Sequence, residues 1–179
     1  MKKTTLSLIV SCILSTFCFA DQQADANLSL KGLPSVGIHV DELPNDALRF
    51  GLRAEELSTL VKHILDKSDV KVLTETDRPN VPGKPYLNVS IFLVANDKNN
   101  SCALMLELSL WQEVKLVRDG KLEAISVMTW KSRGLTLIQP GLSLPAVQTK
   151  LADNVNEFIK DWCQANNKPL PKDKKKMSV

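Results

Sequence analysis

The stretch LMLELSLWQEVKLVRDGKLEAISVMTWK, residues 104–131, decides the fold of this chain. Apolar side chains occupy most even positions of its first half, with polar ones such as Glu107, Ser109 and Glu113 between them. A period of two predicts a strand that is buried on one side. Asp119-Gly120 is a strong signal for a two-residue turn, so we expect a hairpin whose second strand runs from Leu122 to Lys131.

The turn also predicts which side chains share a face. If the strands pair at Arg118 and Lys121, the outward face carries aromatic and apolar residues in place of polar ones. The contact residues predicted on this face are Trp111, Trp130, Met128, Phe92 and Val117, with Leu122 and Val94 beside them.

Large exposed apolar areas are uncommon on monomers and usually mark a contact surface. We therefore expect this face to bind an envelope protein, a lipid-like ligand or a second copy of the chain. The alternative is that the N-terminal lead-in or the Pro-rich loop from Asp77 to Pro85 folds over the face and covers it.

The other predicted elements flank this hairpin. Apolar spacing predicts strands at Val36–Val40, Val70–Leu73 and Tyr86–Ala95, and amphipathic helices at Arg53–Lys67 and Pro145–Asn166. The order is β-α-β-β-β-β-α. It predicts an α+β two-layer sandwich, an antiparallel meander sheet with both helices packed on one face.

The N-terminus predicts export. Lys2-Lys3 is followed by an apolar run, Leu6–Phe19, and by the small residue Ala20, which is the pattern of a secretory signal peptide. Cleavage before Asp21 would leave a periplasmic or secreted protein with no nucleic acid to bind. The alternative is a lipoprotein acylated at Cys12 and held at a membrane.

Four regions follow from this reading: a signal peptide at 1–20, a loose lead-in at 21–34, a single domain at 35–166 and a disordered basic tail at 167–179. The formal charge falls from +3 to +1 when Lys2 and Lys3 are removed. The lysines of the tail suit membrane contact through anionic headgroups, or they serve only to keep the chain soluble.

Two cysteines remain after the leader, Cys102 and Cys163. An even number in an exported chain predicts a disulfide, here closing a loop of about sixty residues. The alternative is two separate buried thiols.

Catalytic residues are not evident in the sequence. His39 lies beside Asp41, and His63 lies on the exposed flank of a helix, neither with a matching nucleophile or metal-ligand partner. We therefore expect no catalytic residue, metal or cofactor. The alternative is a small hydrolase with a site in the loop between Glu75 and Pro85.

Three short segments carry a resemblance: Gly51-Leu52 opening the first helix, Pro85–Val89 opening the meander, and Met128-Thr129-Trp130 closing it. They resemble small exported proteins of bacteria. The architecture is similar to envelope lipoproteins that assist lipopolysaccharide assembly and to auxiliary subunits of lipid-handling transporters. The resemblance implies an exported, non-enzymatic binding or accessory protein of the bacterial cell envelope, and it carries over no site residue.

Overall fold

The computed structural model describes residues 28–49, 51–96, 101–118, 121–138 and 143–171. For residues 49, 95–96, 101–102, 116–118, 121–124, 137–138 and 143 it describes the backbone alone. The predicted signal peptide, Cys12 and the Asp119-Gly120 turn lie outside the described residues.

A five-stranded mixed sheet forms one layer of the fold, in the order β2-β1-β3-β4-β5. The strands are β1 (Ser35–Val40), β2 (Lys71–Val72), β3 (Tyr86–Asn96), β4 (Ser101–Arg118) and β5 (Lys121–Ile138). The last three form the predicted antiparallel meander, whereas β1 runs parallel to both β2 and β3. The described part of β5 forms one edge of the sheet.

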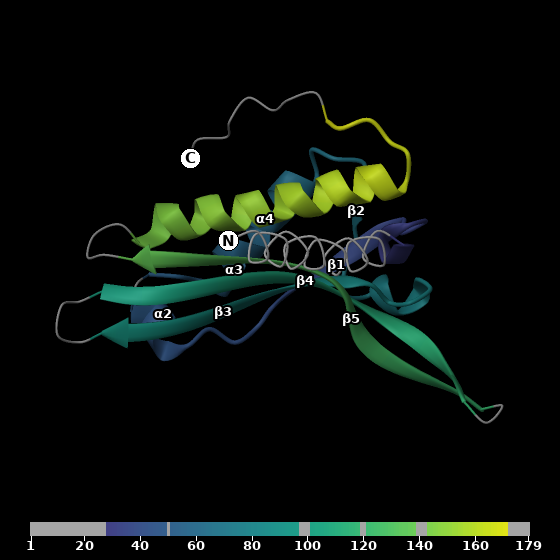
Figure 1. Cartoon of the computed structure of the whole chain (residues 1–179), viewed down its shortest axis with the longest axis horizontal. Helices are drawn as coiled ribbons and strands as arrows, with labels where there is room; N and C mark the ends of the chain where they lie inside the picture. Colours follow the sequence, from purple (N-terminus) through teal and green to yellow (C-terminus); the bar gives the residue numbers. More distant parts are fainter. Residues whose placement is uncertain (1–27, 50, 97–100, 119–120, 139–142, 172–179) are drawn as a thin grey trace, which may run out of the picture.

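Two long helices form the second layer. The helices are α2 (Asn45–Arg49), α3 (Ala54–Leu65), α4 (Ser143–Ala165) and a short 3-10 helix, η1 (Arg78–Asn80). The two longer helices, α3 and α4, lie side by side on the same face of the sheet (Figure 1). The α+β two-layer sandwich is confirmed. The five-residue α2 was not predicted, because it is too short to show a helical period.

The core lies between these layers. The four even-numbered leucines of β4, Leu104 to Leu110, are fully buried against the helices. Facing them, α3 contributes Leu57 and Val61, and α4 contributes the large ring of Phe158. Each such side chain stabilises the fold by about 1.5–3 kcal/mol when it leaves water, so the alternating pattern of β4 accounts for much of the core.

A β-bulge interrupts the pairing of β4 with β5. The register set by the turn holds as far as the pair Trp111–Met128, but the next pair is Leu110–Trp130, and Thr129 is the additional residue. One extra residue moves every later side chain of that strand to the opposite face. The bulge therefore reverses the predicted orientation of β5 beyond Met128.

Trp130 was predicted on the outward face, and this prediction is wrong. Its side chain is only 4% exposed and lies under α4. Its ring packs edge-on against Phe158, with 5.2 Å between centroids, and its Nε1 donates a hydrogen bond to Asp161 Oδ2 at 3.0 Å. The bulge is the physical reason, because counting from the turn without it pairs Trp130 with Ser109.

The lead-in was predicted to be loose, and for its described residues, 28–34, this is wrong. Leu30 is fully buried, and Ser29 Oγ donates to the Thr129 carbonyl at 3.0 Å. Trp162 Nε1 donates to the Leu33 carbonyl at 2.8 Å. The segment packs on the helix side of the sheet, at the bulge, so these residues do not cover the outward face.

The first residues of the predicted tail are exposed, but Lys168 contacts the domain. Lys168 Nζ lies 4.6 Å from the Trp162 ring centroid and 3.2 Å from Asp69 Oδ2. Residues 172–179 lie outside the described residues.

The predicted Cys102–Cys163 disulfide is wrong, since Cys163 is a free, buried thiol. Cys102 pairs with Ile138 at the end of the sheet where α4 begins. Cys163 lies about 30 Å further along that helix at 1.5 Å per residue, whereas a disulfide needs Cα atoms less than about 7 Å apart. Burial raises the pKa of the Cys163 thiol, and it donates to the Pro169 carbonyl at 3.6 Å.

Candidate functional site

The outward face of the sheet is the face that the two long helices leave open. Side chains alternate along a strand, so the even residues of β3 share this face with the odd residues of β4. Cross-strand pairing arranges the described side chains in rows that run from β3 through β4 to β5. These rows are Tyr86–Trp111–Met128, Asn88–Ser109–Lys131, Ser90–Glu107–Arg133 and Phe92–Met105–Leu135.

An apolar patch occupies the end of this face where β3 finishes. We define it as Phe92, Val94, Met105 and Leu135. Phe92 is 53% exposed, Val94 73% and Leu135 72%, while Met105 between them is half-buried. Three of the four are direct cross-strand neighbours, so the patch is continuous over β3, β4 and β5.

The sequence patterns did not predict two members of this patch. Met105 and Leu135 were not among the predicted contact residues, although Leu135 is among the most exposed large apolar side chains described. The charges of Lys131 and Arg133 could have revealed the bulge from the sequence. Without a bulge these two residues would point into the core, which is costly for unpaired charges.

The opposite end of the face is partly covered by the Pro-rich loop. The Arg78 guanidinium lies over the Tyr86 ring, 4.9 Å from its centroid, and Lys84 Nζ is 2.7 Å from Glu113 Oε1. Trp111 in the same row is half-buried, and its Nε1 donates to Ser109 Oγ at 3.1 Å. The loop thus covers the Tyr86 end and leaves the apolar patch open.

Hydrogen-bonded polar side chains lie between the two ends. Asp41 Oδ2 accepts from Ser90 Oγ at 2.5 Å and from Asn88 Nδ2 at 3.0 Å. Asn88 is only 8% exposed, so its side chain lies largely out of contact with solvent. His39 Nε2 is 3.8 Å from Asp41 Oδ1, and Ser90 donates to the aspartate, so no histidine activates this serine.

The predicted contact residues are therefore only partly brought together. Phe92 and Met128 are exposed on the outward face, 53% and 39% respectively, and Trp111 is half-buried there. Trp130 is in the core. Val117 pairs with Leu122 through the backbone, and its side chain lies outside the described ones. Partner binding by these residues stays a prediction.

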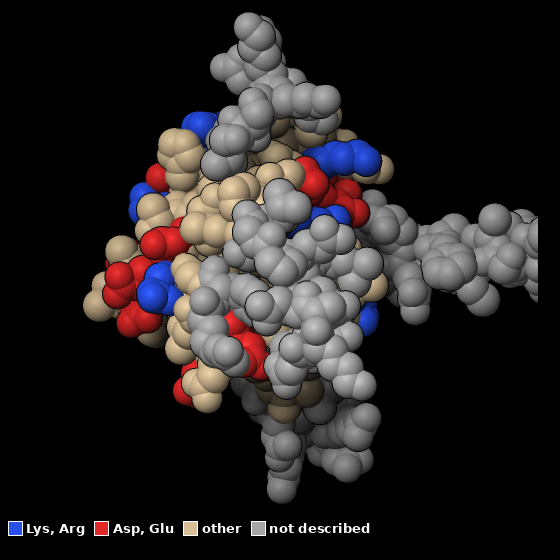
Figure 2. All heavy atoms as spheres, turned by 90° about the vertical axis from the view of Figure 1, so that its left-hand side faces the viewer, with Lys and Arg blue, Asp and Glu red and all other residues tan. Residues whose placement is uncertain are grey.

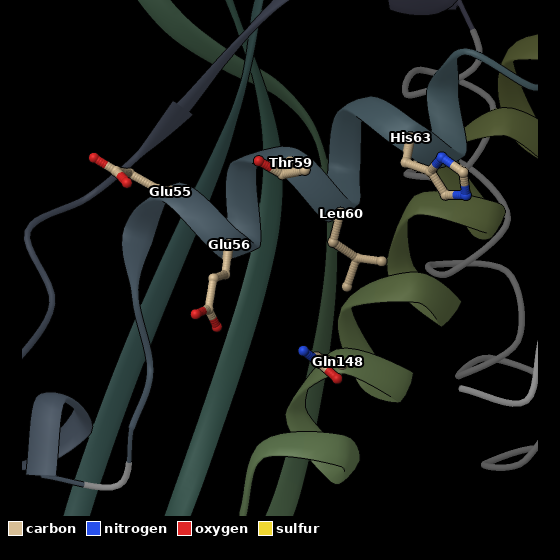
Figure 3. A pocket seen from close by; sticks show the side chains of 6 residues that line it. All are labelled: Glu55, Glu56, Thr59, Leu60, His63 and Gln148. Carbon is tan, nitrogen blue, oxygen red and sulfur yellow. The ribbon is translucent and has the colours of Figure 1, made fainter.

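A cavity of about 490 Å³ lies between the two long helices. Its lining residues are Glu55, Glu56, Thr59, Leu60, His63 and Gln148. Figure 3 shows Glu56 and Leu60 of α3 and Gln148 of α4 facing the space between the helices, while Glu55 points away from it. These side chains do not converge on one point, and no group of three or more His, Cys, Asp or Glu residues suited to a metal occurs in the described ranges.

A second cavity, of about 50 Å³, lies beside the Pro-rich loop and is lined in part by His39, Glu75 and Arg78. Sites for small molecules usually measure about 300–1,000 Å³. This cavity is well below that range. The alternative of a hydrolase with a site in this loop stays a prediction.

Charge is mixed at the end of the molecule that lies at the left of Figure 1. Figure 2 shows acidic and basic side chains interspersed there, with no broad area of one sign among the described residues. Nucleic acids and anionic membranes are usually bound by such an area. This end of the molecule therefore gives no electrostatic support for either partner.

Comparison with known proteins gives only distant structural similarities. No family model matches the sequence, and no curated protein matches it. The PelC dodecamer from Paraburkholderia phytofirmans is similar with a TM-score of 0.38 and 12% identity, over 76% of this chain and 93% of that one. A minor lipoprotein from Acinetobacter baumannii is similar with a TM-score of 0.29 and 14% identity, over 73% and 84% of the two chains.

Within the described ranges, no helix combines the length and the apolar character that crossing a membrane requires.

Proposed function

We propose that this is an exported accessory protein of the bacterial cell envelope that acts by binding a partner protein. The observation that carries the proposal is the apolar patch of Phe92, Val94, Met105 and Leu135 on the outward face. Export rests on the leader at residues 1–20 of the sequence.

The surroundings of the patch favour a protein as the partner. The neighbouring row carries Arg133, which is exposed and paired with the largely buried Glu107, and the next row carries the exposed Lys131. An apolar centre with a polar, charged rim is the usual anatomy of a protein–protein interface. Because Arg133 is already paired, the exposed Lys131 is the cation that suits an acidic side chain of the partner.

The polar residues of the face support binding in preference to catalysis. The Asp41 carboxylate, the Ser90 hydroxyl and the Asn88 amide nitrogen hydrogen-bond to one another. A nucleophile needs a base beside it, and the group beside Ser90 Oγ is a carboxylate that already accepts two hydrogen bonds.

Site-specific photo-cross-linking in intact cells tests this function. A photoreactive residue at position 135 should give an adduct with one protein, and the adduct should be lost when Phe92→Ser is also introduced. A photoreactive residue at Lys160, exposed on α4, is the matched control and should give no such adduct.

Other outcomes would contradict the proposal. An adduct of twice the mass of the chain would identify a second copy as the occupant, and a lipid adduct would identify a lipid-like ligand. The absence of any adduct at positions 92 and 135 would mean that this face does not bind a partner. Mass spectrometry of the mature protein checks export separately, since cleavage as predicted leaves Asp21 at the N-terminus.

A further inference from the structure

Arg78 occupies an unusual place on the outward face. It belongs to η1 in the Pro-rich loop, and its guanidinium lies 4.9 Å from the centroid of the Tyr86 ring. The stem of its side chain passes over Gly37 of β1, where a Cβ would come within 3.1 Å of Arg78 Cδ. The absence of a side chain at Gly37 leaves room for the arginine to lie flat on the sheet.

Hydrogen bonds within the loop fix the backbone beside this arginine. Asp77 N donates to Thr74 Oγ1 at 3.1 Å, and Thr74 Oγ1 donates to Asp77 Oδ2 at 2.7 Å. Arg78 N donates to the Thr74 carbonyl at 3.1 Å. These bonds fix the turn from which Arg78 reaches across the sheet, so the guanidinium is positioned without any ligand.

The edge of the guanidinium is left unsatisfied. The side chain is half-buried, yet its N–H groups make no hydrogen bond or ion pair with any described residue. Stacking on Tyr86 engages the face of the guanidinium and leaves its five N–H donors unused. Partly desolvated donors of this kind normally have an acceptor, and a planar anion fits the fork of an arginine best.

The 50 Å³ cavity adjoins these donors. Its polar lining consists of His39, Thr74, Glu75, Arg78 and Tyr86. His39 stands edge-on to Tyr86, with 6.2 Å between ring centroids, so an imidazole N–H borders the same cavity. The volume admits a group of a few heavy atoms and no more.

We propose that this cavity binds a carboxylate group, held by the Arg78 guanidinium. The small volume favours a carboxylate over a phosphate, and the acidic Glu75 in the lining disfavours a dianion. The carboxylate comes either from a small free acid or from the side chain or C-terminus of a protein segment. Tyr86 and Phe92 are six residues apart on β3, about 20 Å, so this site is independent of the apolar patch and of the proposed function.

NMR of the folded protein provides the test. The chain has one tyrosine and two histidines, so the Tyr86 ring signals are unique, and a His63→Gln variant distinguishes the signals of His39 from those of His63. Acetate should shift the signals of Tyr86 and His39 and saturate at millimolar concentration, as expected for a ligand with so few heavy atoms. His63 on α3 is the internal control and should not move, and sodium chloride at the same ionic strength should shift neither.

Three variants test which residues of the loop determine the affinity for acetate. Arg78→Gln should weaken acetate binding by about tenfold to a hundredfold, the usual value of hydrogen bonds to a charged group. Glu75→Gln should strengthen it by about two- to fivefold, since a nearby like charge is removed. Lys84→Gln removes another cation of the same loop, one already paired with Glu113, and should leave binding unchanged.

Two short peptides distinguish the sources of the carboxylate. Tighter binding of a peptide with a free C-terminal carboxylate than of acetate, with loss of binding on amidation, identifies a protein segment. Equal binding of both carboxylates identifies a small free acid. The proposal is overturned if acetate gives no saturable shift, if Arg78→Gln retains the shift, or if Glu75→Gln weakens binding. The last outcome keeps the test decisive should Arg78→Gln fail to fold.

Discussion

Replacing each of two tryptophans by serine tests the bulge directly. Trp130→Ser removes a side chain that is only 4% exposed, packed on Phe158 and bonded to Asp161. Truncating a buried tryptophan costs about 3–5 kcal/mol, and the serine cannot reproduce the hydrogen bond to the carboxylate. Trp111→Ser removes a half-buried side chain on the outward face and should cost about 1 kcal/mol.

Urea unfolding followed by far-UV circular dichroism measures both free energies. A domain of this size has a total stability of about 5–15 kcal/mol, so Trp130→Ser should lose a large fraction of it. At about 2–4 °C per kcal/mol, its melting temperature should fall by roughly 10 °C, and that of Trp111→Ser by a few degrees.

The conservative variant Trp130→Phe serves if the serine variant does not fold. It keeps an aromatic ring against Phe158, but it loses part of the buried indole and the N–H that bonds to Asp161, so it should cost about 1–3 kcal/mol. Equal losses for Trp111→Ser and Trp130→Ser would refute the reasoning. They would mean that the two indoles lie on the same face of the sheet, which is the arrangement expected if β4 and β5 paired without a bulge.

Three further predictions follow from other parts of the molecule. The double variant Phe92→Ser, Leu135→Ser should keep its unfolding free energy within about 0.5 kcal/mol in a urea titration, because both side chains are largely exposed. The same variant should lose the cross-linked partner. A large loss of stability would mean that these side chains lie in the core. Gly83 has φ +77, so Gly83→Ala should destabilise by about 1 kcal/mol in thermal unfolding, and an unchanged melting temperature would contradict that backbone conformation. Burial raises the pKa of the Cys163 thiol from 9.0, so the folded state holds that proton more tightly; its contribution to stability is present below pH 9 and is lost as pH rises through the raised pKa. Urea titrations from pH 8 to 10 should show a decline that Cys163→Ala removes, and an identical decline in the variant would assign it to other groups.

The sequence predicted the parts of this fold that depend on short-range patterns. The alternating leucines of β4 and the Asp119-Gly120 turn signal were enough to predict the meander, its core face and the pairing as far as Trp111. The two longer helices also follow from local spacing, because an apolar stripe at helical period is visible within the segment itself.

The failures came where the outcome depends on a single residue or on distance in three dimensions. One inserted residue, Thr129, leaves the apolar content of β5 unchanged and yet reverses the faces beyond it. An even number of cysteines says nothing about the distance between them. Cys163 lies far along α4 from the end of the sheet where Cys102 pairs. The bonds that tie Leu30 and Leu33 to α4 join residues more than a hundred positions apart, beyond the reach of any local pattern.

The bulge links the core to the surface that we propose as a docking face. It turns Trp130 and Ser132 inward, where Trp130 fills the space under α4 and Ser132 Oγ donates to Glu157 Oε2 at 2.5 Å. The same shift turns Lys131 and Arg133 outward, into the rows between Trp111 and the apolar patch. A regular strand would place both cations beneath a helix and the indole in water, and each change would cost free energy. The residue that completes the core therefore also gives the outward face its charged rim, and removing Thr129 should damage folding and partner binding together.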